Sequence, residues 1–105
     1  ATNLVRNQRA PLDLHVHTLP IIRTMRAVDE HLGGTFRLLA GRSAETSGGL
    51  LVCLPNRAAA EAFCAELAQL DRRPAWIVGE LVAAAHASAE HNTCIIGDSL
   101  QVLEV

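Results

Sequence analysis

The chain contains no lysine and no tyrosine, and all nine of its basic residues are arginines. It therefore offers no Schiff-base lysine, no lysine general base and no P-loop lysine. By itself it cannot follow the many phosphoryl-transfer schemes that hold a nucleotide phosphate on lysine. The formal net charge is −2, which argues against the Lys/Arg excess of a nucleic-acid-binding surface or a polybasic membrane patch. We expect neither nucleic acid nor a membrane as a partner.

Cysteine is scarce, with only Cys53, Cys64 and Cys94 present. An odd number without a C-x-x-C pair argues against a disulfide framework and a structural zinc site. Cys53 and Cys64 lie in apolar surroundings and are expected to be buried thiols in a reducing compartment. Cys94 lacks the nearby base and electropositive setting that a nucleophile needs. We expect a cytoplasmic protein without a catalytic cysteine.

Long hydrophobic runs are missing, since none approaches the ~18 apolar residues of a membrane span, and no signal-peptide pattern is visible. Half of the 105 residues are hydrophobic and 19% are charged, a globular composition. Without a linker or an internal repeat, residues 1–105 are expected to form a single domain. The chain starts with Ala1 rather than Met, as expected of a processed product or an excised piece.

Hydrophobic periodicity predicts two helices and several strands. Strict alternation over residues 12–18 predicts a half-buried strand, and residues 20–32, with Pro20 at the first helical position, predict a helix. The continuous apolar run 50–54 predicts a central strand covered on both faces, and residues 56–70 form the clearest helix. The shorter elements are an extended piece at 35–40, a strand at 75–83 with a bulge or close approach at Gly79, a strand at 93–96, a turn at 97–99 and a strand at 100–105.

The order of these elements indicates an α+β fold. Two helices lie against one mostly antiparallel sheet, and the β-α-β units are similar to part of the ferredoxin-like topology. Residues 41–49 and 84–92 are expected to be loops.

His15 and His17 are expected on the exposed face of the first strand. Residues i and i+2 of a strand point the same way, so the pair suits metal chelation. A metal site needs three or four convergent ligands, however, and no other histidine has a spacing relation to these two. Solvent-facing histidines are the favoured interpretation. A zinc-dependent rise in melting temperature that disappears when both are replaced would indicate a metal site instead.

The loop Thr46-Ser47-Gly48-Gly49 leads directly into the apolar run 50–54. Consecutive glycines permit backbone conformations in which N–H groups converge on an anion, and Thr46 and Ser47 add hydroxyl donors. The glycines are equally suited to turning the chain into the following strand. Both interpretations, a phosphate contact and a simple turn, stay open on the residues alone.

Residues 45–55, Glu-Thr-Ser-Gly-Gly-Leu-Leu-Val-Cys-Leu-Pro, closely resemble the Thr-Ser-Gly-Gly-Leu-Leu signature of the selenophosphate synthetases, also called selenide, water dikinases. Residues 3–9, 62–66, 75–79 and 103–105 resemble the same family in the same order. The resemblance spans nearly the whole chain. It departs at Ala44, where the family commonly has proline.

The resemblance implies the C-terminal domain of a larger, homodimeric enzyme that makes selenophosphate from selenide, ATP and water and releases AMP and phosphate. It implies a layered α/β fold of the aminoimidazole ribonucleotide synthetase C-terminal type, packed on an N-terminal ATP-binding domain that this chain lacks. The product is the selenium donor for selenocysteine synthesis.

The family's reactive Cys or selenocysteine, its lysine and its magnesium-binding aspartates lie before Ala1. The resemblance thus implies no catalytic or metal-binding residue here, no bound ATP or Mg²⁺, and no activity of the fragment alone. It carries over only Thr46, Ser47, Gly48 and Gly49, on the phosphate side of the interdomain cleft. The alternative is a stand-alone α+β module that binds a partner or oligomerises without catalysis.

Overall fold

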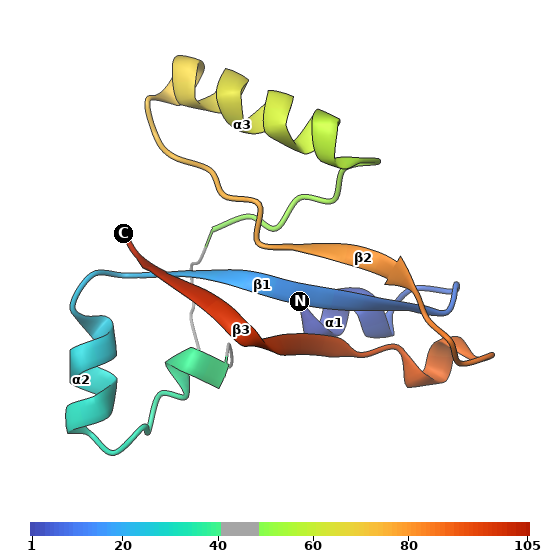
Figure 1. Ribbon diagram of the computed structural model, residues 1–105, viewed down its shortest axis with the longest axis horizontal. Coiled ribbons are helices and arrows are strands. Elements are labelled where there is room, and N and C mark those ends of the chain that lie inside the picture. Colours follow the sequence, from blue (N-terminus) through green and yellow to red (C-terminus); the bar gives the residue numbers. More distant parts are fainter. Residues whose placement is uncertain (41–48) are drawn as a thin grey trace. The chain divides into compact units, whose positions relative to one another are not determined.

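A computed structural model describes residues 1–40 and 49–105. The chain forms two compact units: Ala1–Thr46 with Val78–Val105 (unit 1), and Ser47–Ile77 (unit 2). Unit 1 contains a three-stranded sheet with short helices, and unit 2 contains one α-helix (Figure 1). This is an α+β arrangement. None of the helices in the described part of the chain has the length and apolarity needed to cross a lipid bilayer.

The sheet of unit 1 has the order β2-β1-β3. The central strand β1 (Leu12–Ile21) pairs antiparallel with β2 (Gly79–Ala83) and parallel with β3 (Cys94–Glu104). The prediction of a mostly antiparallel sheet is therefore wrong, and the sheet is mixed. The alternation predicted for the start of β1 is confirmed, with Leu14 buried and His15 exposed.

β1 runs further than predicted and includes Pro20, which was expected to begin a helix. Proline cannot donate a backbone hydrogen bond, so within sheets it is confined to positions without that demand. β2 pairs with β1 only as far as Val16. Pro20 therefore lies beyond β2, paired with Leu103 of β3, where a missing N–H on the β2 side is tolerated.

β1 and β3 are irregular at the same level of the sheet, next to the residue that precedes β2. The backbone N–H groups of His17 and Thr18 both donate to the carbonyl of Val78, at 3.0 and 3.1 Å, and this bulge leaves Thr18 buried. On β3, Val16 pairs with Ile96 but Thr18 pairs with Gln101, so the ladder skips the residues between them.

The two strands predicted at 93–96 and 100–105 are consequently one strand, and the turn predicted at 97–99 is an irregularity within it.

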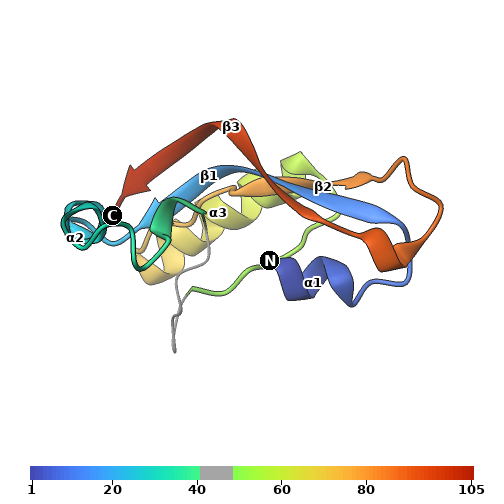
Figure 2. The ribbon, with the colours of Figure 1, turned by 90° about the horizontal axis from the view of Figure 1, so that it is seen from below.

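Helix α1 (Thr2–Arg6) packs on one face of the sheet (Figure 2). Its Val5 is fully buried, and the other buried hydrophobic residues of the described chain are Leu14, Ile21 and Leu38. The 3₁₀ turn η2 (Ala89–His91) precedes β3 and contacts α1. The buried core of unit 1 is therefore small, and its backbone and polar hydrogen bonds matter correspondingly more.

Helix α2 (Met25–His31) begins five residues later than predicted because the chain up to Ile21 belongs to β1. The buried carboxylate of Asp29 accepts hydrogen bonds from the backbone N–H groups of Phe36 (2.7 Å) and Leu38 (3.1 Å). These bonds hold the following chain against α2. The piece predicted to be extended at 35–40 is therefore a turn followed by the 3₁₀ helix η1 (Leu38–Ala40).

In unit 2, helix α3 (Arg57–Asp71) confirms the clearest sequence prediction. The side chain of Asn56 caps it by accepting from the N–H of Ala59 at 2.9 Å. Arg72, with φ of 53°, ends it in the left-handed region. None of its residues is buried.

The apolar run 50–54, predicted to be a buried strand, forms no strand, and its side chains are exposed. The reason is that the run has no ladder partner among the described residues, and without one a strand's backbone groups go unpaired. Leu50 is 95% exposed. Cys53, expected to be buried, is exposed.

Candidate functional site

The loop selected from the sequence is only partly described. Thr46, Ser47 and Gly48 lie outside the described residues. Gly49 is exposed, and a Cβ atom added to it would meet nothing within 4 Å. Close packing therefore does not require glycine at this position, and the phosphate contact stays a prediction.

His15 and His17 are both exposed on β1, as expected. His15 pairs across the sheet with Glu80, and the Nδ1 atom of His17 lies 2.8 Å from the Thr18 hydroxyl. Nowhere in the described ranges do three His, Cys, Asp or Glu side chains gather as a metal ion would require. The structure thus brings no third ligand to the pair from the residues it describes.

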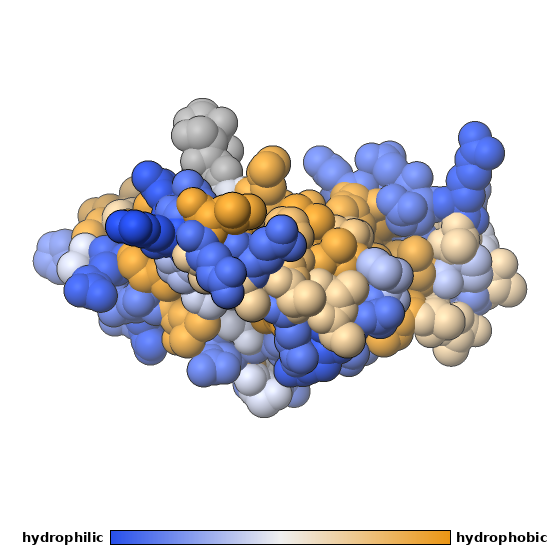
Figure 3. Space-filling model, turned by 90° about the horizontal axis from the view of Figure 1, so that it is seen from above, coloured by the Kyte–Doolittle hydropathy of each residue, from blue (hydrophilic) through white to orange (hydrophobic). Residues whose placement is uncertain are grey.

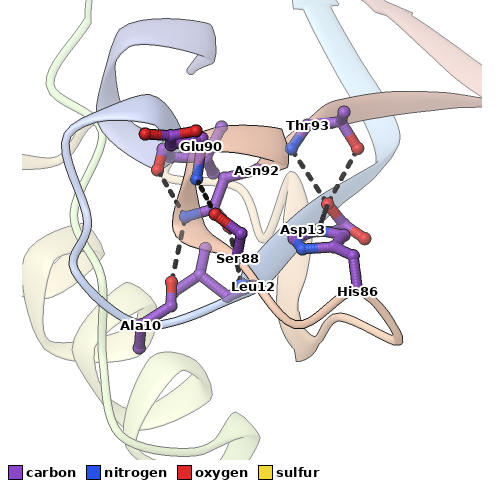
Figure 4. A network of polar contacts seen from close by, with 9 residues as sticks. Ala10, Leu12, Asp13, His86, Ser88, Glu90, Asn92 and Thr93 are labelled. Atoms are coloured by element: carbon purple, nitrogen blue, oxygen red, sulfur yellow. Dashed lines mark hydrogen bonds and ion pairs between the residues drawn. The ribbon is translucent and has the colours of Figure 1, made fainter.

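A polar network that the sequence did not predict lies at the end of the sheet where β1 and β3 begin (Figure 4). Asp13 Oδ1 accepts hydrogen bonds from the backbone N–H of Thr93 (2.9 Å) and from its hydroxyl (2.8 Å). The Nε2 atom of His86 lies 3.4 Å from the same oxygen. One carboxylate thereby fixes the start of β3 and the preceding loop to β1.

Asn92 forms the second half of this network and is only 4% exposed. Its Nδ2 donates to the carbonyl oxygens of Val5 and Ala10, each at 2.9 Å, and its Oδ1 accepts from the N–H of Leu12 at 3.0 Å. A single amide therefore joins α1, the entry to β1 and the entry to β3 (Figure 4).

The Thr93 hydroxyl is the largest influence on the Asp13 carboxyl and, with the Thr93 N–H, lowers the pKa of Asp13 below its usual 3.8. Desolvation of the carboxylate opposes this shift, and His86 adds to it. Because the pKa is lower in the folded than in the unfolded chain, ionised Asp13 stabilises the fold above pH 3.8. This stabilisation is lost as the pH falls through the folded-state pKa.

Replacing Asp13 with asparagine is expected to flatten the acid limb of the stability profile. The wild-type free energy of unfolding should fall more steeply below pH 3.8 than that of Asp13→Asn, measured by urea denaturation at a series of pH values. Asp98 is an exposed residue of β3, so Asp98→Asn is the matched control. It should keep the wild-type dependence of stability on pH. Identical slopes for wild type and Asp13→Asn contradict the assignment.

The geometry of the network is that of a structural hydrogen-bond network and not of a catalytic nucleophile–base pair. In a nucleophile–base pair the hydroxyl contacts the imidazole, and a third group orients that imidazole. Here Thr93 and His86 both contact the same oxygen of Asp13. The Nδ1 atom of His86 is buried with no hydrogen-bond partner in the described chain.

The sequence shows only one part of this network, since Asn92 and Thr93 form a polar pair directly before the apolar residues 94–96. Nothing in the sequence relates that pair to Asp13, which lies 80 residues away from Thr93.

The chain is similar over its whole length to selenide, water dikinases. It is 43% identical to the Dictyostelium discoideum protein and 39% identical to the Leishmania major protein, in both cases over all of this chain. It is 49% identical to human selenide, water dikinase 2 over 73% of this chain. No family model matches the sequence.

The chain spans only 29%, 27% and 17% of the length of these three relatives. Similarity that covers all of the chain but a minor part of each relative is what a segment of a larger protein shows, as the resemblance of residues 45–55 implied. The chain is a segment that belongs to the selenide, water dikinase family.

Proposed function

We propose that the complete parent protein makes selenophosphate from selenide, ATP and water, with release of AMP and phosphate, and that these 105 residues form its C-terminal domain. The supporting observation is the 43% identity over the whole chain to 29% of a selenide, water dikinase. The parent is cytoplasmic and homodimeric, and it carries an N-terminal ATP-binding domain.

The segment has a supporting role in this proposal. It contains no lysine to hold a nucleotide phosphate. The reactive residue, the lysine and the groups that hold the metal ion belong to the rest of the parent, and this domain closes the cleft against them. The α+β organisation of unit 1 agrees with a fold of the aminoimidazole ribonucleotide synthetase C-terminal type.

Residues 46–49 are this segment's proposed contribution to the ATP site. In the complete enzyme, the hydroxyl groups of Thr46 and Ser47 and the backbone N–H groups of Gly48 and Gly49 face the phosphates. Hydrogen bonds to a charged phosphate are worth about 1.5–3 kcal/mol each. The loop can therefore affect ATP affinity although none of its residues takes part in the chemical step.

The test is the double variant Thr46→Ala/Ser47→Ala in the complete parent. We expect KM for ATP to rise by about tenfold or more, since each tenfold step corresponds to about 1.4 kcal/mol, with the melting temperature unchanged. Ser43→Ala, just before this loop, serves as the control and should retain the wild-type KM. A lower melting temperature with unchanged KM would show that the loop only shapes the chain.

A further inference from the structure

We propose that Asp29 is a positioning residue for the loop at residues 46–49, because it anchors the chain shortly before that loop. The inference rests on the proposed function, which assigns the loop to the phosphates of ATP. Apolar side chains reach the surface in several places in the view of Figure 3. Exposure of that kind is ordinary and singles out no site, whereas a buried carboxylate such as that of Asp29 is rare and needs an explanation.

The burial of Asp29 depends on hydrogen bonds from the returning chain. Asp29 is 6% exposed, and the ion pairs within the described part of the chain do not include it. A buried carboxylate is costly unless hydrogen bonds replace the water that it loses. Here the backbone N–H of Phe36 donates to Oδ1 at 2.7 Å, and that of Leu38 donates to Oδ2 at 3.1 Å. Asp29 is therefore satisfied in its buried position only while the returning chain stays against α2.

The two hydrogen bonds lie on either side of Arg37, which has a strained backbone. Three residues between α2 and η1 adopt the left-handed region, namely Gly33 (φ 68°), Gly34 (φ 75°) and Arg37 (φ 51°). Glycine enters this region readily, whereas arginine does so against a steric cost. Because Asp29 binds the N–H groups of the residues before and after Arg37, it holds Arg37 in this conformation. The turn is thus maintained by one side chain and not by backbone preference alone.

Asp29 also determines where η1 lies. Among the elements of the described chain, η1 packs chiefly on α2, and Figures 1 and 2 both show the two next to each other. η1 ends at Ala40, the last described residue before the loop at 46–49. The hydrogen bonds of Asp29 therefore fix the point from which the chain continues toward that loop.

The length of chain between a fixed point and the loop sets the expected effect. With η1 anchored, Ala40 is the fixed point and roughly six residues lead to Thr46; without the anchor the fixed point is Leu32, at the end of α2, and the tether grows to roughly fourteen residues. The effective concentration of a tethered group falls as about the −3/2 power of the tether length. Loss of the anchor should therefore weaken ATP binding about fourfold.

Hydrogen exchange and kinetics of the complete parent carrying Asp29→Asn test the proposal. The variant keeps the shape of the side chain but replaces one acceptor oxygen with an NH₂ group. We expect the two amides that donate to Asp29 to exchange faster, while sheet amides such as that of Leu14, which donates to Thr93, stay protected. The KM for ATP should rise about fourfold, with the KM for selenide unchanged. Faster exchange with an unchanged KM for ATP overturns the proposal, because Asp29 is then purely structural.

Glu30→Gln is the matched control. Glu30 is the exposed neighbour of Asp29 on α2, and it pairs with Arg26 at 2.9 Å on the surface. The substitution removes the same charge from the same helix without touching the anchor. Exchange and both KM values should stay at the wild-type level. A rise in the KM for ATP equal to that of Asp29→Asn contradicts the proposal.

Gly34→Ala disturbs the turn by a second route that leaves the carboxylate of Asp29 intact. The φ of Gly34 is +75°, and an added Cβ atom would meet nothing within 4 Å, so the cost comes from the backbone conformation alone. We expect the same two changes, faster exchange of the amides bound to Asp29 and a raised KM for ATP. If Asp29→Asn also exposes the sheet amides, this variant decides, and an unchanged KM for ATP with faster exchange overturns the proposal.

Failure of this inference is distinguishable from failure of the proposed function. A raised KM for ATP in the Thr46→Ala/Ser47→Ala variant but not in Asp29→Asn overturns the inference and leaves the proposed function standing. A parent that makes no selenophosphate overturns the proposed function. The affinity for ATP, measured by calorimetry, then takes the place of KM, and an affinity unchanged by Asp29→Asn overturns the inference as well.

Discussion

Replacing Asn92 with alanine is expected to lower the free energy of unfolding by about 3 kcal/mol, because buried backbone groups lose their partners. The carbonyls of Val5 and Ala10 and the N–H of Leu12 all depend on this amide. Urea denaturation at neutral pH measures the change as a lower midpoint with a similar slope.

Two further variants make the Asn92 result specific. Asn7→Ala removes an exposed asparagine at the end of α1 and should change stability by about 0.5 kcal/mol or less. Asn92→Asp keeps an acceptor for Leu12 but sets a carboxylate against two carbonyl oxygens, so it should be at least as destabilising as alanine. A wild-type urea midpoint for Asn92→Ala contradicts the role assigned to this residue.

Replacing Gly79 with alanine is expected to cost about 2–4 kcal/mol by overpacking. The added Cβ would collide with the carbonyl oxygen of His15 and lie 3.1 Å from Val16 Cα. These are backbone atoms of the central strand, so no change of rotamer relieves the clash and the β1–β2 pairing must shift. Thermal unfolding followed by circular dichroism should show a melting temperature lower by roughly 10 °C or more.

Gly97→Ala is the matched control for Gly79→Ala. Gly97 also lies in a strand next to Val16, but the nearest atom to its added Cβ is the Val16 carbonyl oxygen, at 4.0 Å. The substitution should therefore shift the melting temperature little. Equal shifts for the two variants are incompatible with a close backbone approach at Gly79.

Local signals predicted the elements that depend on local contacts. The helix after Asn56 carries its own cap and its own Arg57–Glu61 pair, so α3 was found almost to the residue. The alternation that begins at Leu12 identified β1, and a glycine within a strand pattern pointed correctly to a close approach at Gly79.

Contacts between distant residues account for what the sequence did not show. Pro20 suits the first turn of a helix and a strand equally well in φ, and its pairing with Leu103 decides for the strand. Asp13 and Thr93 are 80 residues apart, so no window of sequence relates them. The run 50–54 was wrongly predicted to be a buried strand, because an apolar pattern does not say which strand edge is available to it.

The candidate site depended on specific sequence text rather than on periodicity. The Thr46–Gly49 loop was open to two interpretations from its residue types alone. Its resemblance to one family signature assigned the chain to selenide, water dikinases, and similarity over the whole chain to the Dictyostelium and Leishmania proteins confirms the family.

The most direct test of the account is phosphorus NMR of ATP and selenide mixed either with the complete parent or with the 105-residue chain. The account predicts selenophosphate, AMP and phosphate with the parent, and unchanged ATP with the chain, which has no lysine. A selenophosphate signal above background from the chain alone would contradict the supporting role. Its absence with the complete parent would contradict the enzyme assignment.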